Sequence, residues 1–132
     1  MQGEGLRCHR AGHNMDGYQN RTGFRITYAQ QLRYDTFLAE AAHERGLAIA
    51  IKNDPDQVAD LVDLYDFAIT EDCFECNWCG EMSPFVDQNK AVLAAEYTDT
   101  GARPSRFRPE AEALGFDAIF KKRNLGAWRR SR

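Results

Sequence analysis

Residues 66–78, with the sequence DFAITEDCFECNW, form the segment that decides the fold. The segment begins with a short apolar run at residues 67–69 and ends in carboxylates, thiols and aromatic rings, closing with Cys79. Parallel α/β enzymes present catalytic groups in this way, on a buried strand that carries a carboxylate at its carboxyl end. The plainer interpretation is a strand followed by an ordinary polar loop.

The same pattern of an apolar run that stops at polar residues recurs along the chain. Strands are predicted at residues 47–51, 67–69, 90–95 and 116–120. Helices are predicted from a capping box at Thr27 and Gln30, from Asp54-Pro55, from Ser83-Pro84, and from about Pro109 to Leu114. Strands and helices that alternate in this way indicate a parallel sheet with right-handed crossovers.

The first predicted helix carries apolar residues at helical spacing. They are Tyr34, Leu38, Ala41 and Ala42, and Phe37 broadens the same face. We expect this face to be buried. Near the carboxyl terminus, residues 125–128 are expected to form a turn that packs Trp128 on the body of the domain.

A polar pair follows each predicted strand. The pairs are Lys52-Asn53, Thr70-Glu71, Glu96-Tyr97 and Lys121-Lys122. Because the carboxyl ends of parallel strands meet at one edge of a sheet, we expect these residues to form one site with two carboxylates, several cations and an aromatic ring. The alternative is that some of the pairs are buried ion pairs that close the top of the core.

Size and charge limit the class of protein. The chain has 132 residues, of which 43% are hydrophobic, so it is expected to be one domain or part of a larger one. The net charge of −3 argues against a nucleic-acid partner, and the basic residues 129–132 are expected to be a solvated tail. No apolar run reaches the roughly 18 residues of a membrane helix. The first 25 residues lack the apolar centre of a signal peptide, so the chain as written is expected in the cytoplasm.

The four cysteines leave several interpretations open. Cys73, Cys76 and Cys79 are each separated by two residues, and Cys8 is distant from them. This spacing is compatible with a metal site, with a disulfide among the three or with Cys8, or with free thiols. The second, distant ligand pair of a zinc ribbon is missing.

Residues 14–129 resemble the second half of a family 114 glycoside hydrolase domain, the TIM-barrel family of endo-α-1,4-polygalactosaminidases. The matching motifs occur in the same order, at residues 47–54, 66–74, 84–85, 90–92, 96–97, 114–116, Lys121 and 127–129. The resemblance implies an α/β fold that contains the carboxyl-terminal half, about strands 4/5 to 8, of a (β/α)8 barrel. It further implies a glycosidase that cuts α-linked galactosamine polysaccharide with two carboxylates, needs no cofactor or metal ion, and is secreted in most relatives.

The resemblance also assigns roles to individual residues. Glu71 is the candidate general acid/base, and its place at the rim of an apolar strand is expected to raise its pKa. The candidate substrate-binding residues are Asn14, Tyr18, Lys52, Asn53, Glu96, Tyr97 and Lys121. Cys73 and Cys79 match family cysteines and are the candidate disulfide.

The chain departs from the family before residue 14. The position of the second catalytic carboxylate, an aspartate, holds His13, and a histidine cannot replace that group. Asp16 is the nearest substitute carboxylate, so hydrolysis by this chain is expected to be impaired. Codons that can encode residues 5–13 spell Gly-Cys-Asp-Ala-Ile-Glu-Pro-Asp when they are translated one base later, which is the missing family strand. Our hypothesis is therefore that residues 1–13 are irregular, out-of-frame sequence, followed by a partial barrel at 14–129 and a basic tail at 130–132.

Two other functions are compatible with these residues. One is a non-catalytic half barrel that binds carbohydrate, and the other is a small α/β domain with a cysteine-based metal or redox site. A half barrel leaves strand edges open, so self-association through these edges is expected, whereas nucleic-acid and membrane partners are not.

Overall fold

The computed structural model describes residues 15–131, and its central feature is one five-stranded sheet in the order β1-β2-β3-β4-β5. The strands are β1 (Ala50–Lys52), β2 (Phe67–Glu71), β3 (Val92–Tyr97), β4 (Asp117–Lys121) and β5 (Arg129–Arg130). The first four run parallel, whereas β5 is antiparallel to β4. A closed barrel has eight parallel strands, so this arrangement corresponds to a partial barrel. The predictions for residues 1–13 and Asn14 lie outside the described residues.

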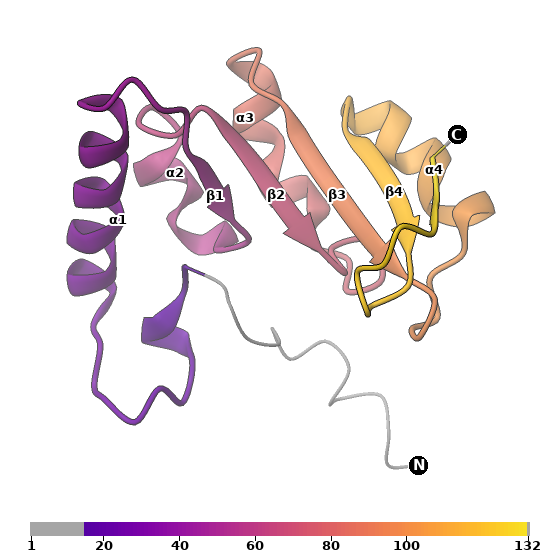
Figure 1. The fold of residues 1–132 in the computed structure, drawn as a ribbon, viewed down its shortest axis with the longest axis horizontal. Helices are drawn as coiled ribbons and strands as arrows, with labels where there is room; N and C mark the ends of the chain where they lie inside the picture. Colours follow the sequence, from indigo (N-terminus) through magenta and orange to yellow (C-terminus); the bar gives the residue numbers. More distant parts are fainter. Residues whose placement is uncertain (1–14, 132) are drawn as a thin grey trace.

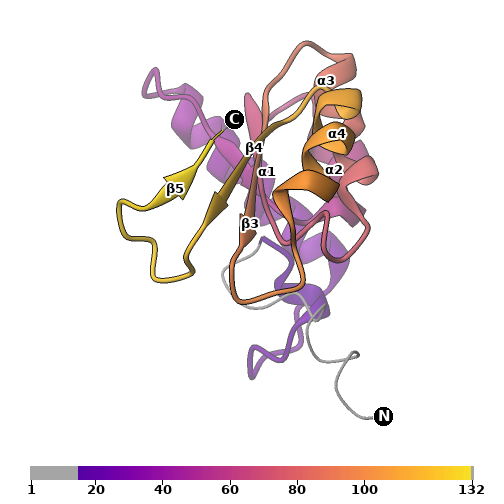
Figure 2. The same ribbon diagram turned by 90° about the vertical axis from the view of Figure 1, so that its right-hand side faces the viewer.

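Four helices accompany the sheet (Figure 1). They are α1 (Tyr28–His43), α2 (Val58–Leu61), α3 (Ser83–Asp87) and α4 (Pro104–Leu114), and short 3₁₀ turns occur at Gly17–Gln19, Pro55–Gln57 and Cys79–Met82. Figure 2 shows α2, α3 and α4 on one side of β3 and β4. None of the helices in the described part of the chain is long and apolar enough to cross a membrane.

The helix boundaries follow local chemistry, with two corrections to the predictions. The capping box of α1 is present, with Thr27 and Gln30 satisfying each other's backbone N–H groups. The predicted cap at Ser83 is wrong, because α3 begins at Ser83 directly after a 3₁₀ turn. The predicted start of α4 at Pro109 is also wrong, because Pro104 occupies the first turn and Pro109 lies inside the helix.

The strand boundaries differ from the predictions at both edges of the sheet. β1 has only three residues, because the Ile49 N–H donates to the Asp66 side chain, at 2.8 Å, instead of joining the ladder. At the other edge, the predicted tail does not begin at Arg130. Arg130 pairs with Phe120 in β5, and Arg129 pairs with Lys121.

The buried face of α1 matches the predicted apolar face only in part, because Leu38, Ala41 and Ala42 are half-buried whereas Tyr34 and Phe37 are not. Its buried residues are Gln31, Asp35 and Ala39, while the side chains of Tyr34 and Phe37 are 57% and 61% exposed. The Gln31 amide explains this orientation, because it accepts from the Gly17 N–H at 3.1 Å and donates to Asp35 at 3.0 Å. The outer face of α1 therefore presents two large aromatic side chains to solvent.

The two faces of the sheet have different neighbours. Side chains alternate along each strand, so the register places Ile51, Ala68, Val92 and Ala94 on one face, where all are buried in the core. Lys52, Ile69, Glu71, Leu93, Tyr97 and Lys121 share the opposite face. In a barrel this second face points inward, toward the axis. Leu93 is 39% exposed here, so part of this apolar face is uncovered.

Candidate active site

Glu71 is the centre of a polar cluster on the inward face of the sheet. It ends β2, and its Oε2 lies 2.7 Å from the Lys52 ammonium at the end of β1. The Tyr97 hydroxyl at the end of β3 donates to the other carboxylate oxygen, Oε1. The Glu71 backbone N–H donates to Asn53 Oδ1 at 2.9 Å. Three adjacent strand ends thus meet at one carboxylate. Lys52, Asn53, Glu71 and Tyr97 therefore lie together, as the polar pairs at the strand ends predicted.

The pKa of Glu71 differs from the sequence expectation. Partial burial acts to raise it, but the hydrogen bonds from Lys52 and Tyr97 and the nearby positive charges of Lys52 and Arg123 outweigh this effect. The pKa of Glu71 is therefore lowered, and the predicted raised pKa is wrong for the described structure. In this arrangement the carboxylate is ionised, and it can attract a cation, accept a proton or act as a nucleophile.

Arg123 is a member of the cluster that was not identified from the sequence. Its Nη1 and Nη2 each lie 3.0 Å from one oxygen of Asp72, and its Nε lies 2.7 Å from Asp99. Its guanidinium carbon lies 4.0 Å from the centroid of the Tyr97 ring. Its signal in the sequence was a charged residue just after a strand end, directly following the Lys121-Lys122 pair.

Lys121 lies on the same face of the sheet as Glu71 and Tyr97. Its ammonium donates to the Gly126 carbonyl at 3.1 Å, within the connection from β4 to β5. Lys121 therefore borders the cluster and holds the neighbouring loop.

Glu96 does not line the predicted site. It precedes Tyr97, so strand alternation directs it to the opposite face, and its side chain is fully buried. Its two oxygens accept from the N–H groups of Phe74 and Glu75, at 2.9 and 3.2 Å. Burial raises the pKa of Glu96 to about 7, although these two hydrogen bonds act to lower it. The prediction that Glu71 and Glu96 share one site is therefore wrong.

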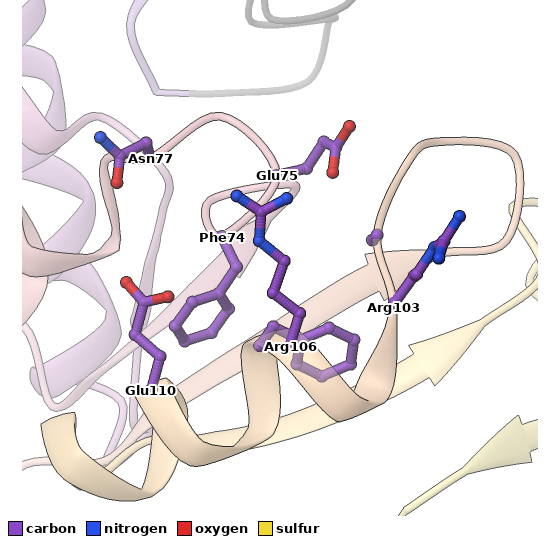
Figure 3. Close-up of a pocket in the computed structure, with 8 residues that line it drawn as sticks. Phe74, Glu75, Asn77, Arg103, Arg106 and Glu110 are labelled. Carbon is purple, nitrogen blue, oxygen red and sulfur yellow. The ribbon is translucent and has the colours of Figure 1, made fainter.

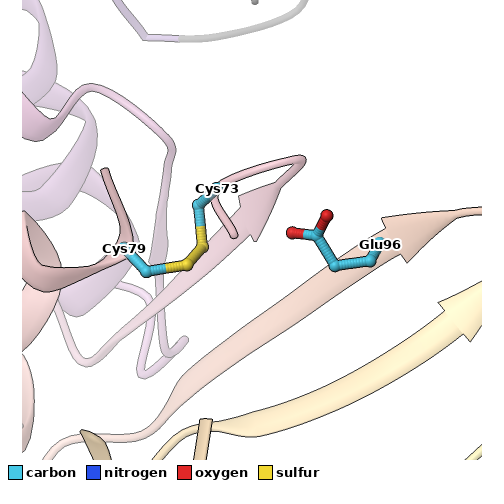
Figure 4. A group of neighbouring side chains, drawn as sticks. All are labelled: Cys73, Cys79 and Glu96. Atoms are coloured by element: carbon cyan, nitrogen blue, oxygen red, sulfur yellow. A yellow bond between two sulfur atoms is a disulfide. The ribbon is translucent and has the colours of Figure 1, made fainter. Parts of the chain in front are cut away.

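Glu96 instead lies beside a disulfide between Cys73 and Cys79 (Figure 4). The sulfurs and the carboxylate lie within 4.8 Å of one another, a spacing that would suit a metal ion. Both thiols are joined to each other, however, so they do not offer thiolate ligands. In the described structure this trio holds the loop at residues 73–79 against β3.

Tyr18 and Asp16 belong to a second polar cluster, next to Asn53. The Tyr18 hydroxyl donates to Asp54 Oδ1 at 3.1 Å. Asp54 is fully buried, and its backbone adopts the left-handed conformation with φ of 51°. Asp16 is also fully buried, and it accepts from Asn20 at 2.7 Å. A substrate cannot reach a carboxylate that is fully buried, so Asp16 has a structural role in the described structure.

Three buried carboxylates influence one another in this second cluster. Burial raises the pKa of Asp54 to about 7, and the negative charge of Asp16 adds to this effect. Burial likewise raises the pKa of Asp35 to about 6. Asp54 and Asp35 therefore stay protonated at a higher pH than an exposed aspartate does.

A cavity of about 420 Å³ lies outside the strand ends, between the loop after β2 and the first turns of α4 (Figure 3). Its wall carries two arginines, two glutamates, an asparagine and two phenylalanine rings: Arg103, Arg106, Glu75, Glu110, Asn77, Phe74 and Phe107. The two rings stack with centroids 5.9 Å apart. Its mixed charges favour neither an anion nor a cation.

Comparison with known proteins places this geometry in a family. A family model described as glycoside-hydrolase family GH114 matches residues 12–132. The chain is also similar to the crystal structure of Aspergillus fumigatus Ega3 in complex with galactosamine, with 28% identity and a TM-score of 0.79. This similarity covers 90% of the chain and 51% of Ega3, so the chain spans about half the length of that relative. A comparison with curated proteins found no match. The chain belongs to glycoside-hydrolase family GH114.

Proposed function

We propose that this chain is the carboxyl-terminal part of a glycoside hydrolase that acts on galactosamine-containing polysaccharide, with Glu71 as a catalytic carboxylate. The observation that carries the proposal is the position of Glu71 at the end of β2, on the face that a barrel encloses, with hydrogen bonds from two neighbouring strands. Membership of family GH114 and the galactosamine bound by Ega3 support the reaction and the sugar.

The surroundings of Glu71 suit a cationic sugar. A galactosamine ammonium can replace the Lys52 ammonium at Glu71 Oε2, because both are hydrogen-bond donors with one positive charge. Because the replacing ammonium carries the same charge, it would keep the pKa of Glu71 low and the carboxylate ionised, the form that accepts a proton or acts as a nucleophile. Lys52 is thus proposed to keep Glu71 ionised before the substrate binds, and the ammonium of the bound sugar to keep it ionised afterwards.

A glycosidase of this type needs a second carboxylate. The family position for it is His13 in this sequence, and Asp16 is buried. We therefore propose that this chain binds the sugar and turns it over slowly or not at all. The polar cluster at Glu71 supports binding by itself, which makes a non-catalytic carbohydrate-binding half barrel the second candidate function.

Hydrolysis of galactosaminogalactan, with and without Glu71→Gln, tests the proposal. Alongside, titration with galactosamine followed by NMR measures binding. We expect binding that Glu71→Gln weakens, and Glu40→Gln, which changes a carboxylate on the exposed side of α1, serves as the control. Turnover that needs Glu71 identifies an enzyme, and binding without turnover identifies the second candidate. If Glu71→Gln changes neither turnover nor binding, the assignment of Glu71 fails.

The extent of the domain is part of the same proposal. We propose that residues 14–129 are one partial family barrel, and that the family strand before residue 14 was lost through a frameshift in residues 1–13. Sequencing the gene upstream of residue 14 tests this. The frameshift hypothesis fails if no reading frame there encodes a strand with the family's second carboxylate.

A further inference from the structure

We propose that Arg123 is a positioning residue, which holds Tyr97 and the backbone after Glu71 so that the Glu71 carboxylate points at the substrate. This inference rests on the proposed role of Glu71. Arg123 comes from the connection between β4 and β5, far from Glu71 in the sequence. Its charge acts on the pKa of Glu71 from a distance, but its hydrogen bonds go to Asp72 and Asp99, so we infer that it positions the Glu71 carboxylate through other residues.

The first link is a fixed guanidinium. Two of its nitrogens bind the two oxygens of Asp72 at 3.0 Å each, and the third binds Asp99 at 2.7 Å. A planar guanidinium that makes a paired contact of this kind has a defined plane and direction, which a lysine ammonium does not have. Asp72 and Asp99 therefore fix the plane of Arg123 between the loops that follow β2 and β3.

The second link is the Tyr97 ring. The guanidinium carbon lies 4.0 Å from the ring centroid, a distance at which a cation is attracted to an aromatic face. The Tyr97 residue is only 2% exposed. With its face covered by Arg123, the ring is held in one position, and its hydroxyl donates to Glu71 Oε1. This contact also means that the covered face of Tyr97 does not serve as a stacking surface for a sugar.

The third link is the backbone. Asp72 directly follows Glu71 and has φ of 56°, a left-handed conformation that is uncommon for a residue other than glycine. Its N–H donates to the Ala95 carbonyl at 3.0 Å, and its carboxylate is held by Arg123. Arg123 thus restrains Glu71 from two directions, through the Tyr97 hydroxyl and through the chain that leaves β2.

The decisive variant is Arg123→Lys, because it keeps the positive charge and removes the paired contact. The measurement is the pKa of the Glu71 carboxyl, followed by carbon-13 NMR in the full chain, together with the dissociation constant for galactosamine. We expect a higher pKa of Glu71 and binding weakened about 3- to 10-fold, as for the loss of one charge-assisted contact. Arg33→Lys, on the exposed side of α1, is the matched control and should change neither quantity.

A second variant shows whether the effect passes through Tyr97. In a Tyr97→Phe background the hydroxyl is absent, so Arg123→Lys should shift the pKa of Glu71 less than it does in the unchanged chain. An equal shift in both backgrounds, or no shift from Arg123→Lys, overturns the proposal. If the proposed function fails, galactosamine does not bind the unchanged chain. The pKa of Glu71 measured by NMR still tests the role of Arg123 in that case.

Discussion

The Lys52 ammonium lies 2.7 Å from Glu71 Oε2, so a cation from β1 neutralises the carboxylate at the end of β2. Both side chains keep part of their surface in solvent, at 24% and 28%. The pair is therefore accessible to a charged ligand, and its opening has a measurable consequence for the proton on Glu71.

Removing the cation with Lys52→Met should raise the pKa of Glu71, because burial then acts with less opposition. The carboxyl titration followed by NMR gives this pKa directly. Lys90→Met removes a lysine near the other end of the sheet, where Lys90 bonds to the Val62 carbonyl, and is the control. A pKa of Glu71 that stays below its usual range in Lys52→Met would contradict this explanation.

The buried Glu96 should be sensitive to a change that keeps its shape. In Glu96→Gln one acceptor oxygen is replaced by an NH₂ group that faces a backbone N–H, so unfolding free energy should fall by about 1–3 kcal/mol. Chemical denaturation measures this difference. Glu110→Gln makes the same substitution on an exposed helix face and should be close to neutral. Equal stability of the two variants would show that the hydrogen bonds of Glu96 contribute little.

The buried aspartates predict how stability depends on pH. Asp54 and Asp35 titrate near 7 and 6 in the folded chain and near 3.8 when exposed, so the folded state binds more protons between these values. Unfolding free energy should therefore fall as pH rises from about 5 to about 8. The lowered pKa of Glu71 has the opposite effect, because its contribution to stability is lost as pH falls below the usual pKa of a glutamate. The measurement therefore starts at about pH 5, where Glu71 is ionised in both the folded and the unfolded chain.

The slope of that pH dependence should become smaller in Asp54→Asn, because one of the protons no longer titrates. Denaturation at several pH values measures the slope, and the exposed Asp87→Asn is the control. If Asp54→Asn leaves the slope unchanged, Asp54 does not contribute to the pH dependence of the unfolding free energy.

The disulfide should stabilise the chain through the short loop that it closes. Cys73 and Cys79 are six residues apart, and cross-linking a loop of this size is worth about 2 kcal/mol by the chain-entropy estimate. Replacing both cysteines by alanine should lower the unfolding free energy by about this amount, as measured by chemical denaturation. If the double variant is as stable as the unchanged chain, the contacts of Glu96 hold the loop without the disulfide.

The two exposed aromatic side chains on the outer face of α1 should promote self-association. Replacing Tyr34 and Phe37, both more than half exposed, by serine should reduce concentration-dependent association in sedimentation velocity. Leu125→Ser removes an equally exposed apolar side chain at the opposite end of the chain. Association that responds to Leu125 and not to the α1 pair would place the contact elsewhere.

The sequence was sufficient where a local signal agreed with the tertiary contacts. Apolar runs predicted the parallel strands, and the residue types at Thr27 and Gln30 predicted the capping box. Polar residues at the strand ends predicted that Lys52, Glu71 and Tyr97 would meet. Glu96 illustrates the limit of that argument. Two adjacent residues inside a strand face opposite sides, so of Glu96 and Tyr97, which both lie in β3, only Tyr97 could reach the site.

Other differences depend on partners that are distant in the sequence. The Asp66 side chain binds the Ile49 N–H and shortens β1, and Gln31 joins Gly17 to Asp35 and turns part of the predicted apolar face of α1 toward solvent. Arg123 enters the site from a loop that no local pattern connects to Glu71. None of these contacts has a periodic signal, because each depends on how two separate elements are packed.

The short strand β5 has a consequence for stoichiometry. It pairs with Phe120 and Lys121 and so occupies the carboxyl half of the outer edge of β4, while the outer edge of β1 has no strand beside it in residues 15–131. A sheet with two free edges can add copies without limit, whereas a sheet with one edge blocked can accept a single neighbour. β5 therefore leaves the outer edge of β1 as the more open of the two edges, so we expect strand pairing between copies to favour a pair joined through β1 over a fibre.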